Sequence, residues 1–266
     1  MKRRRKEEKR ESKGKKEEEW IKTGIKGFDE LFEKGMGIPK GSSVLVSGGP
    51  GSGKTLFCLQ IVANAAKEGK KCLYMSFEES EERLREHMES FGWNLSELEK
   101  KRNLIIKRYS SVDISRAMDA LYAKERGELL IDFDPIILPE NFRPDIVVVD
   151  SLSAIASAFI GKEENYRSYI EQLFRFFENL GVNSFLISEA HGITSYSRSG
   201  VEEFLADGVI VLYYLRKGGV REHAIEILKM RGSKFKKRIV PMKISDSGIE
   251  VFPEQEIFGE FEEVKV

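Results

Sequence analysis

The fold of this chain is decided by the stretch SVLVSGGPGSGKT, residues 43–55. Its last eight residues, 48–55, fit the phosphate-binding loop pattern G-x-x-x-x-G-K-[ST] at every position. The apolar segment 43–47 precedes this phosphate loop, and apolar side chains recur at helical spacing over 56–67. We therefore expect the loop between a buried strand and the N-terminus of a helix, where backbone N–H groups and the helix dipole favour phosphate.

The residue types in the phosphate loop predict a division of roles. Lys54 is expected to reach the outer phosphates of a nucleoside triphosphate, and the Thr55 hydroxyl is expected to hold Mg²⁺. An ordinary glycine-rich turn would also join a strand to a helix, but the agreement of eight residues with their context favours the phosphate loop. The other residues expected around the phosphates are Gly48, Gly49, Pro50, Gly51, Ser52, Gly53 and Leu56.

The composition fits one large α/β domain better than two independent ones, because the chain has 266 residues. Hydrophobic residues make up 41 %, enough for a full core, and charged residues 33 %, against about 25 % in a typical soluble protein. The excess of Lys and Glu favours a heat-adapted organism. The formal net charge of +0 excludes a global attraction for nucleic acid. Cys58 and Cys72 lie in apolar segments and are predicted to be buried thiols.

The two ends of the chain differ from its middle. Residues 1–19 are almost wholly charged and predict a disordered tail or a solvated helix. The basic cluster 2–6 could touch nucleic acid or an acidic partner, but interspersed glutamates favour a solvated tail. The main domain is expected over 20–253, with an inserted hairpin or surface loop near 126–143 and an acidic extension over 254–266. No secretory signal or apolar run long enough for a membrane is visible, so we expect a cytoplasmic protein.

Two carboxylates, Glu78 and Glu79, follow a predicted buried strand over 71–77. At the carboxyl end of a strand beside the phosphate loop they would lie near the γ-phosphate, where a residue orients or deprotonates an attacking water. Acidic residues also favour the first turn of a helix, and 81–91 has a helical pattern. Both interpretations can hold together.

Two further strands end in polar residues on the same side. The strand over 144–151 is apolar until Asp150, which would bind the Mg²⁺ shell through water. The strand over 183–189 ends in Ser188 and Glu189, which would either sense the γ-phosphate or only cap the strand. His191 opens a Ser-, Gly- and Thr-rich loop and is expected to be an ordinary loop histidine.

The last part of the sequence predicts antiparallel strands over 209–214 and 224–228 and a terminal hairpin over 240–253. Lys229 and Arg231 follow the second strand at positions i and i+2, so they point to one face of an extended segment. Taken alone, they are compatible with a solvated edge.

Seven segments together resemble the KaiC-like branch of the RecA/DnaB ATPase superfamily, in a single-domain, archaeal-looking form. The likeness covers about residues 21–253. The segments are TGIKGFD at 23–29, the phosphate loop, FEES at 77–80, SFGW at 90–93, VDS at 149–151, GVEEF at 200–204 and KMRGS at 229–233.

The resemblance implies a RecA-like P-loop fold, with a twisted, mostly parallel sheet, helices on both faces and a C-terminal β-hairpin. It also implies a homo-oligomeric ring, usually a hexamer, that binds ATP between subunits. Hydrolysis would depend on Mg²⁺ and drive a conformational or assembly switch. Glu78 and Glu79 would be the catalytic carboxylates and Ser90 would lie near the base.

By the same resemblance, Lys229 and Arg231 would reach the nucleotide of the next subunit, with Arg231 acting as an arginine finger. Met230 and Ser233 would border the base and ribose. Two departures matter. Glu202 and Glu203 stand where the autophosphorylating half of the cyanobacterial protein has a Ser-Thr pair, which argues against an autokinase. A histidine that the family often places after the Lys-x-Arg-Gly segment is Phe235 here.

Two other functions stay open on the sequence. One is a DNA-binding recombinase or helicase relative, favoured by the basic tail and by the basic run 234–238, which could line a pore or bind nucleic acid. No helix–hairpin–helix segment or separate DNA-binding domain supports it. The other is a nucleotide-gated scaffold that recruits an unknown protein partner with little turnover.

Overall fold

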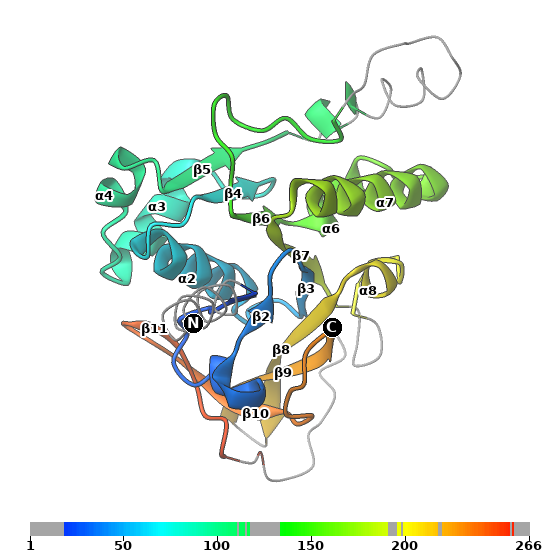
Figure 1. Ribbon diagram of the computed structural model, residues 1–266. Helices are drawn as coiled ribbons and strands as arrows, with labels where there is room; N and C mark the ends of the chain where they lie inside the picture. The colour runs from blue at the N-terminus through cyan, green and yellow to red at the C-terminus, as the bar shows by residue number, and fades with distance from the viewer. Residues whose placement is uncertain are drawn as a thin grey trace, which may run out of the picture.

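The computed structural model describes residues 19–110, 112–114, 116–117, 134–190, 196–197, 199–217, 220–255 and 257. Within these residues, nine strands form one sheet in the order β11-β10-β9-β8-β3-β7-β6-β4-β5 (Figure 1). The strands from β8 to β5 are parallel, and β9, β10 and β11 extend the sheet antiparallel. The strands are β3 Ser43–Gly48, β4 Cys72–Ser76, β5 Leu104–Arg108, β6 Ile146–Asp150, β7 Asn183–Glu189, β8 Gly208–Lys217, β9 Val220–Met230, β10 Val240–Ser245 and β11 Gly248–Val251.

The central strands are buried on both faces because helices cover both sides of the sheet (Figure 1). Successive residues of β3 alternate between two hydrophobic cores. Val44 and Val46 pack in the core on the α2 side, and Leu45 packs in the core on the α7 side. One side carries α2 Lys54–Lys67, α3 Glu81–Ser90 and α4 Leu95–Lys100; the other carries α6 Leu152–Ser157, α7 Glu163–Leu180 and α8 Glu202–Leu205.

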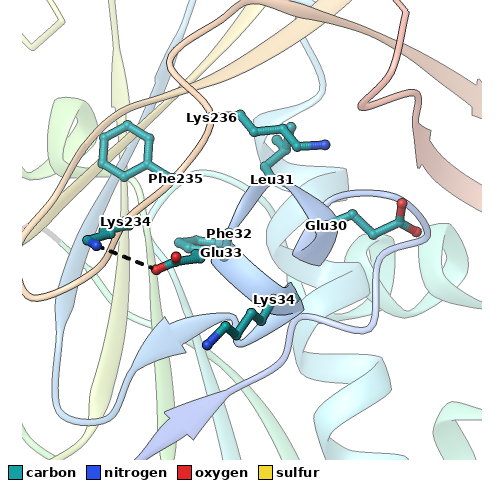
Figure 2. A pocket seen from close by; sticks show the side chains of 9 residues that line it. Glu30, Leu31, Phe32, Glu33, Lys34, Lys234, Phe235 and Lys236 are labelled. Atoms are coloured by element: carbon teal, nitrogen blue, oxygen red, sulfur yellow. Dashed lines mark ion pairs between the residues drawn. The ribbon is translucent and has the colours of Figure 1, made fainter.

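The N-terminal segment packs under the antiparallel end of the sheet. It contains β1 Trp20–Ile21, the 3₁₀ helices η1 Asp29–Leu31 and η2 Glu33–Gly35, and β2 Ile38–Pro39. Phe32 forms an isolated bridge with Phe235, which joins this segment to the stretch after β9. Between them lies an open pocket of about 510 Å³, lined by residues 30–35 and 234–236 (Figure 2). Its charged lining is mixed in sign, and Lys234 lies 4.0 Å from the Glu33 carboxylate.

The predicted α/β class, the mostly parallel sheet, the helices on both faces and the C-terminal hairpin are confirmed. The buried, free state of Cys58 and Cys72 is confirmed as well. Two short helices, α6 and α8, were not predicted. Ser151 begins α6 by accepting a hydrogen bond from the Ala154 N–H at 3.2 Å. A Ser-rich segment directly after a strand gave no clear helical period.

Several predicted segments fall wholly or partly outside the described residues. These are the tail 1–18, residues 118–133 of the region near the insertion, His191, and residues 258–266. The described part of the insertion, 134–143, forms a loop whose Ile136 and Phe142 are buried. Across the described ranges, no helix is both long enough and apolar enough to span a membrane.

Candidate active site

The phosphate loop lies between β3 and α2, at the carboxyl edge of the parallel strands. Gly53 has φ of +97° at the N-cap of α2, a conformation that favours glycine. Gly48 is required for a different reason, because neighbouring atoms leave no room for a side chain. A Cβ at this position would lie 2.3 Å from the Leu212 carbonyl oxygen and 2.6 Å from Ser52 Oγ. These glycines therefore let the backbone take a path that other residues would block.

Lys54 folds back over its own loop. Its Nζ donates hydrogen bonds to the carbonyl oxygens of Gly48 at 2.9 Å and Gly49 at 3.0 Å. Burial lowers the pKa of Lys54, and the nearby carboxylates of Glu189, Asp150 and Glu78 oppose that shift. The ammonium group is thus held inside a ring of acceptors at the point where the loop would close around phosphates.

Ser52 adds a second feature to the loop. Its Oγ is buried and has no hydrogen-bond partner within the described residues. A buried hydroxyl without a partner costs free energy, about 1–3 kcal/mol for typical groups. A ligand with acceptor oxygens would remove that cost, so the loop carries an unmet donor next to Lys54.

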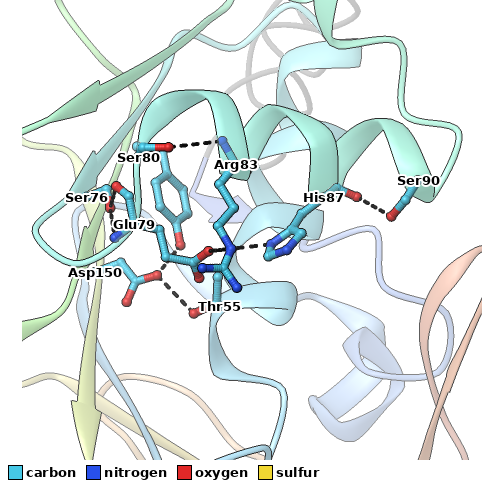
Figure 3. Close-up of polar contacts among 9 residues, drawn as sticks. Thr55, Ser76, Glu79, Ser80, Arg83, His87, Ser90 and Asp150 are labelled. Carbon is cyan, nitrogen blue, oxygen red and sulfur yellow. Dashed lines mark hydrogen bonds and ion pairs between the residues drawn. The ribbon is translucent and has the colours of Figure 1, made fainter.

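Asp150 ends β6 and faces the first turn of α2 (Figure 3). Its Oδ2 accepts hydrogen bonds from the Thr55 hydroxyl at 3.0 Å and from the Tyr74 hydroxyl at 2.5 Å. The side chain is buried, and this burial raises the pKa of Asp150 to about 6 although both hydroxyls favour the charged form. The predicted pair of metal-binding residues, Thr55 and Asp150, is therefore in direct contact.

Glu78 and Glu79, adjacent in sequence, have different partners. A Glu78 carboxylate oxygen accepts a hydrogen bond from the Ser151 hydroxyl, next to Asp150. The Glu79 Oε2 lies 3.3 Å from the Arg83 Nε and 3.8 Å from the His87 Nδ1, on α3 (Figure 3). Glu78 is also among the carboxylates that raise the pKa of Lys54. Glu78 belongs to the cluster around the loop. Glu79 is tied to the cations of α3, and its charge, like that of Glu78, also raises the pKa of Asp150.

At the end of β7, the side chains of Ser188 and Glu189 point to opposite faces of the sheet. Phe185 and Ile187 pack in the core on the α2 side, so Glu189 points the same way, towards the loop. Ser188 points to the other face, where its Oγ is buried without a partner within the described ranges. Of the two residues expected near the γ-phosphate, only Glu189 is turned towards Lys54.

Comparison with known proteins identifies the family. A family model described as "ATPase: KaiC" matches residues 21–256. This chain belongs to the KaiC ATPase family. It is 32 % identical to a UPF0273 protein of Thermotoga maritima, over 88 % of this chain and 96 % of that protein. It is 34 % identical to a UPF0273 protein of Aeropyrum pernix, over 88 % and 94 %.

The match to the circadian clock oscillator protein KaiC covers less than half of that protein. The Synechococcus elongatus protein is 31 % identical over 88 % of this chain but over only 44 % of its own length. The crystal structure of a KaiC-like protein from the hyperthermophilic archaeon Pyrococcus horikoshii superposes with a TM-score of 0.72 at 31 % identity. That match covers 88 % of this chain and 99 % of the other, so the likeness in fold extends over nearly the whole of that protein.

Lys229, near the end of β9, and Arg231, just after it, lie at the opposite end of the strands from the phosphate loop. Strand pairing places Lys229 opposite Val209, and Val209 opposite Leu45 near the start of β3. The loop begins after Gly48, about 10 Å further along that strand at the usual rise per residue. Lys229 and Arg231 are therefore not beside the loop of their own chain.

Both cations bind the carboxyl end of α8. Lys229 Nζ donates to the carbonyl oxygens of Glu203 at 2.9 Å and Ala206 at 2.6 Å. Arg231 donates to the Phe204 carbonyl at 2.9 Å and lies 3.3 Å from the Asp207 carboxylate. Burial lowers the pKa of Lys229, and the nearby Arg231 adds to that shift. We call these acceptors at the end of α8 the carbonyl seat.

Three other residues expected around the base lie apart from the loop. Met230 is buried, and its Cε would be 2.5 Å from a Cβ on Gly208, so it packs inside the chain and not on its surface. Ser90 is exposed at the far end of α3, where its hydroxyl donates to the His87 carbonyl (Figure 3). Ser233 is half-buried beyond β9. In the single chain none of the three contacts the phosphate loop.

The basic run 234–238 is partly neutralised by acids. Lys236 and Arg238 both pair with Glu254, the latter at 3.2 Å. Lys234 faces Glu33 across the pocket of Figure 2. This pairing disfavours the use of the run as a nucleic-acid surface, which would need cations free for phosphate.

Sequence reasoning missed two contacts of the site. Tyr74 lies in an apolar strand, where a phenol gives no sign of a polar partner. His223, on β9, stacks on Tyr214 with 4.4 Å between ring centroids and lies 3.0 Å from the Gly51 carbonyl oxygen. The register of the β8–β9 hairpin, which no local pattern specifies, brings His223 to the loop.

Proposed function

We propose that this protein is a Mg²⁺-dependent ATPase of the KaiC type that works as a ring, with ATP at each boundary between subunits. One observation carries the proposal: the phosphate loop lies at one end of the strands, and Lys229 and Arg231 lie at the other end. A chain built in this way completes its site only when a second copy brings its cations to the loop of the first. The resemblance to the family makes a hexamer the expected ring.

The residues present fit ATP and Mg²⁺. Ser52 has an unmet hydroxyl in the loop, and Lys54 is surrounded by weak carbonyl acceptors that phosphate oxygens would replace. Within the described ranges, no three His, Cys, Asp or Glu side chains gather as a metal site, so an ion would need nucleotide oxygens as well. Thr55 would hold it directly and Asp150 through water. Bound there, Mg²⁺ would neutralise charge on the β- and γ-phosphates.

The acids and cations then divide the chemistry. Glu78, held by Ser151 beside Asp150, would orient the attacking water and accept its proton. Glu79 would support the site through α3. Glu189 would sense the outer phosphate, and Arg231 of the next subunit would stabilise the charge that develops on it, worth about 10³–10⁵ in rate for arginine fingers. Turnover would change the contacts at the boundary and thereby the state of the ring.

Subunit complementation tests the proposal. Lys54→Ala and Arg231→Ala variants should each hydrolyse little ATP. When the two are co-expressed in equal amounts, about a quarter of the boundaries in a head-to-tail ring would join an intact loop to an intact finger. We expect about a quarter of the wild-type turnover from the mixture. Turnover no higher than that of the separate variants would refute the shared site.

The complementation needs a control and a measure of assembly. Lys101→Ala removes an exposed cation at the end of α4 that pairs with Glu97, and it should leave turnover unchanged. Light scattering with ATP, ADP or no nucleotide reports the size of the assembly. A monomer with full turnover would contradict the proposed ring, and a ring without turnover would leave only the scaffold function.

A further inference from the structure

Tyr74 lies on β4, next to the edge strand β5, with its hydroxyl on Asp150, the acid proposed to hold the water shell of Mg²⁺. It is in the middle of β4 and is fully buried in the core on the α2 side. The β4–β6 register places Ser76 opposite Asp150, so Tyr74 and Asp150 are diagonal neighbours on one face. A long aromatic side chain can span this diagonal. The Tyr74 hydroxyl accordingly meets the Asp150 Oδ2 at 2.5 Å.

Packing alone does not require this hydroxyl. A phenylalanine would fill the same apolar space, whereas a buried phenol loses free energy unless it has an acceptor. The acceptor is the Asp150 carboxylate, which also accepts a hydrogen bond from the Thr55 hydroxyl. A hydrogen bond to a charged acceptor is stronger than one between neutral groups.

The two hydroxyls leave one carboxylate oxygen available. Within the described residues, both hydrogen bonds to the Asp150 carboxylate go to Oδ2. One donor alone would let the carboxylate rotate about its terminal bond, because such torsions are broad. Donors from two elements, α2 and β4, restrict that rotation and keep Oδ1 free to accept from a water on the metal.

We propose that Tyr74 is a positioning residue for Asp150: its hydroxyl fixes the carboxylate in the orientation that binds the water shell of Mg²⁺. This inference rests on the proposed ATPase function. It assigns to a residue of the apolar core a contribution to metal affinity. It predicts that removal of the Tyr74 hydroxyl oxygen reduces the gain in nucleotide affinity due to Mg²⁺ and leaves the phosphate loop itself intact.

The test compares Tyr74→Phe with Tyr169→Phe. Tyr169 is also fully buried, and its hydroxyl donates to the Pro135 carbonyl at 3.2 Å, on the opposite side of the sheet. The control therefore removes a buried hydroxyl without touching the site. The affinity of each protein for a fluorescent ADP analogue is measured with Mg²⁺ and with EDTA, and the ratio gives the gain due to the metal.

We expect Tyr74→Phe to reduce the gain due to the metal by about tenfold, the lower range for residues that orient metal ligands, with the affinity in EDTA unchanged. The Mg²⁺ concentration for half-maximal hydrolysis should rise in parallel, and Tyr169→Phe should match the wild type in both. An unchanged gain in Tyr74→Phe would overturn the inference. So would equal losses with Mg²⁺ and EDTA, since they would mean general damage to the loop. Failure of the ATPase proposal is distinguished because the wild type itself would then show no turnover, whereas the affinities with Mg²⁺ and with EDTA still compare Tyr74→Phe with the wild type.

Discussion

Replacement of Asp150 by Asn should stabilise the nucleotide-free protein at neutral pH. The carboxylate is 5 % exposed, and its burial raises the pKa from the usual 3.8 to about 6. A group with a raised pKa in the folded state contributes stability below pH 3.8 that is lost as the pH rises through 6. At about 1.4 kcal/mol per unit, the loss at neutral pH is about 3 kcal/mol. An amide, which carries no charge, avoids that loss.

The assay is urea unfolding without nucleotide, at several pH values between 4 and 8, followed by the fluorescence of the buried Trp93. We expect the free energy of unfolding of Asp150→Asn to exceed that of the wild type by about 3 kcal/mol at pH 7.5. The difference should shrink towards pH 4. Asp145→Asn, at an exposed carboxylate before the same strand, gives the effect of the same chemical change without burial.

Two results would refute this reasoning. One is a variant that is less stable than the wild type at pH 7.5. The other is a constant difference between the two proteins at every pH. In either case the buried charge would not be the cost that the geometry implies. With Mg²⁺ and ATP present the order should reverse, because a charged carboxylate holds the water shell of the metal more strongly than a neutral amide does.

Three further predictions concern the phosphate loop and the acids beside it. Glu78→Gln should lower kcat by about 10²–10⁴ while a fluorescent nucleotide still binds, and Glu79→Gln should lower it less; the reverse order would exchange their roles. Lys54→Ala should remove turnover and most of the nucleotide affinity measured by fluorescence titration, and retained turnover would exclude the loop as the phosphate site. Gly48→Ala should lower the free energy of unfolding in urea by about 1–3 kcal/mol, because its Cβ would meet the Leu212 carbonyl. Gly49→Ala, which has open space, should cost less, and equal losses would contradict the packing argument.

The sequence was sufficient for the features that local chemistry imposes. The phosphate loop must follow a strand and begin a helix, and β3 and α2 do so. Asp150 could be predicted because a buried parallel strand is apolar until it reaches the ligand edge. The proposed role of Arg231 in the neighbouring subunit came from family resemblance and not from spacing. The register of β9 with β8 supports it, because it places Arg231 away from the phosphate loop of its own chain, and no local sequence pattern contains that register.

Features that depend on contacts across the sheet could not be predicted. The different partners of Glu78 and Glu79 follow from where Ser151 and α3 lie, and two adjacent acids look alike in a sequence. Met230 was expected near the base, but its close approach to Gly208 buries it. Tyr74 has the same apolar neighbours in the sequence as a core residue would have.

The carbonyl seat has a consequence for how subunits would recognise one another. Lys229 and Arg231 already have acceptors before any neighbour arrives, so a lone subunit does not present two bare positive charges to passing surfaces. Lys229 has neutral carbonyls as acceptors and Arg231 has carbonyls together with the Asp207 carboxylate, and a group with several negative charges holds a cation more strongly than either set. A new partner must therefore offer more negative charge than the seat, as a triphosphate does. In the proposed ring, the two cations would leave the carbonyl seat only when the phosphate loop of the neighbouring subunit holds a nucleotide. Assembly would then depend on bound nucleotide.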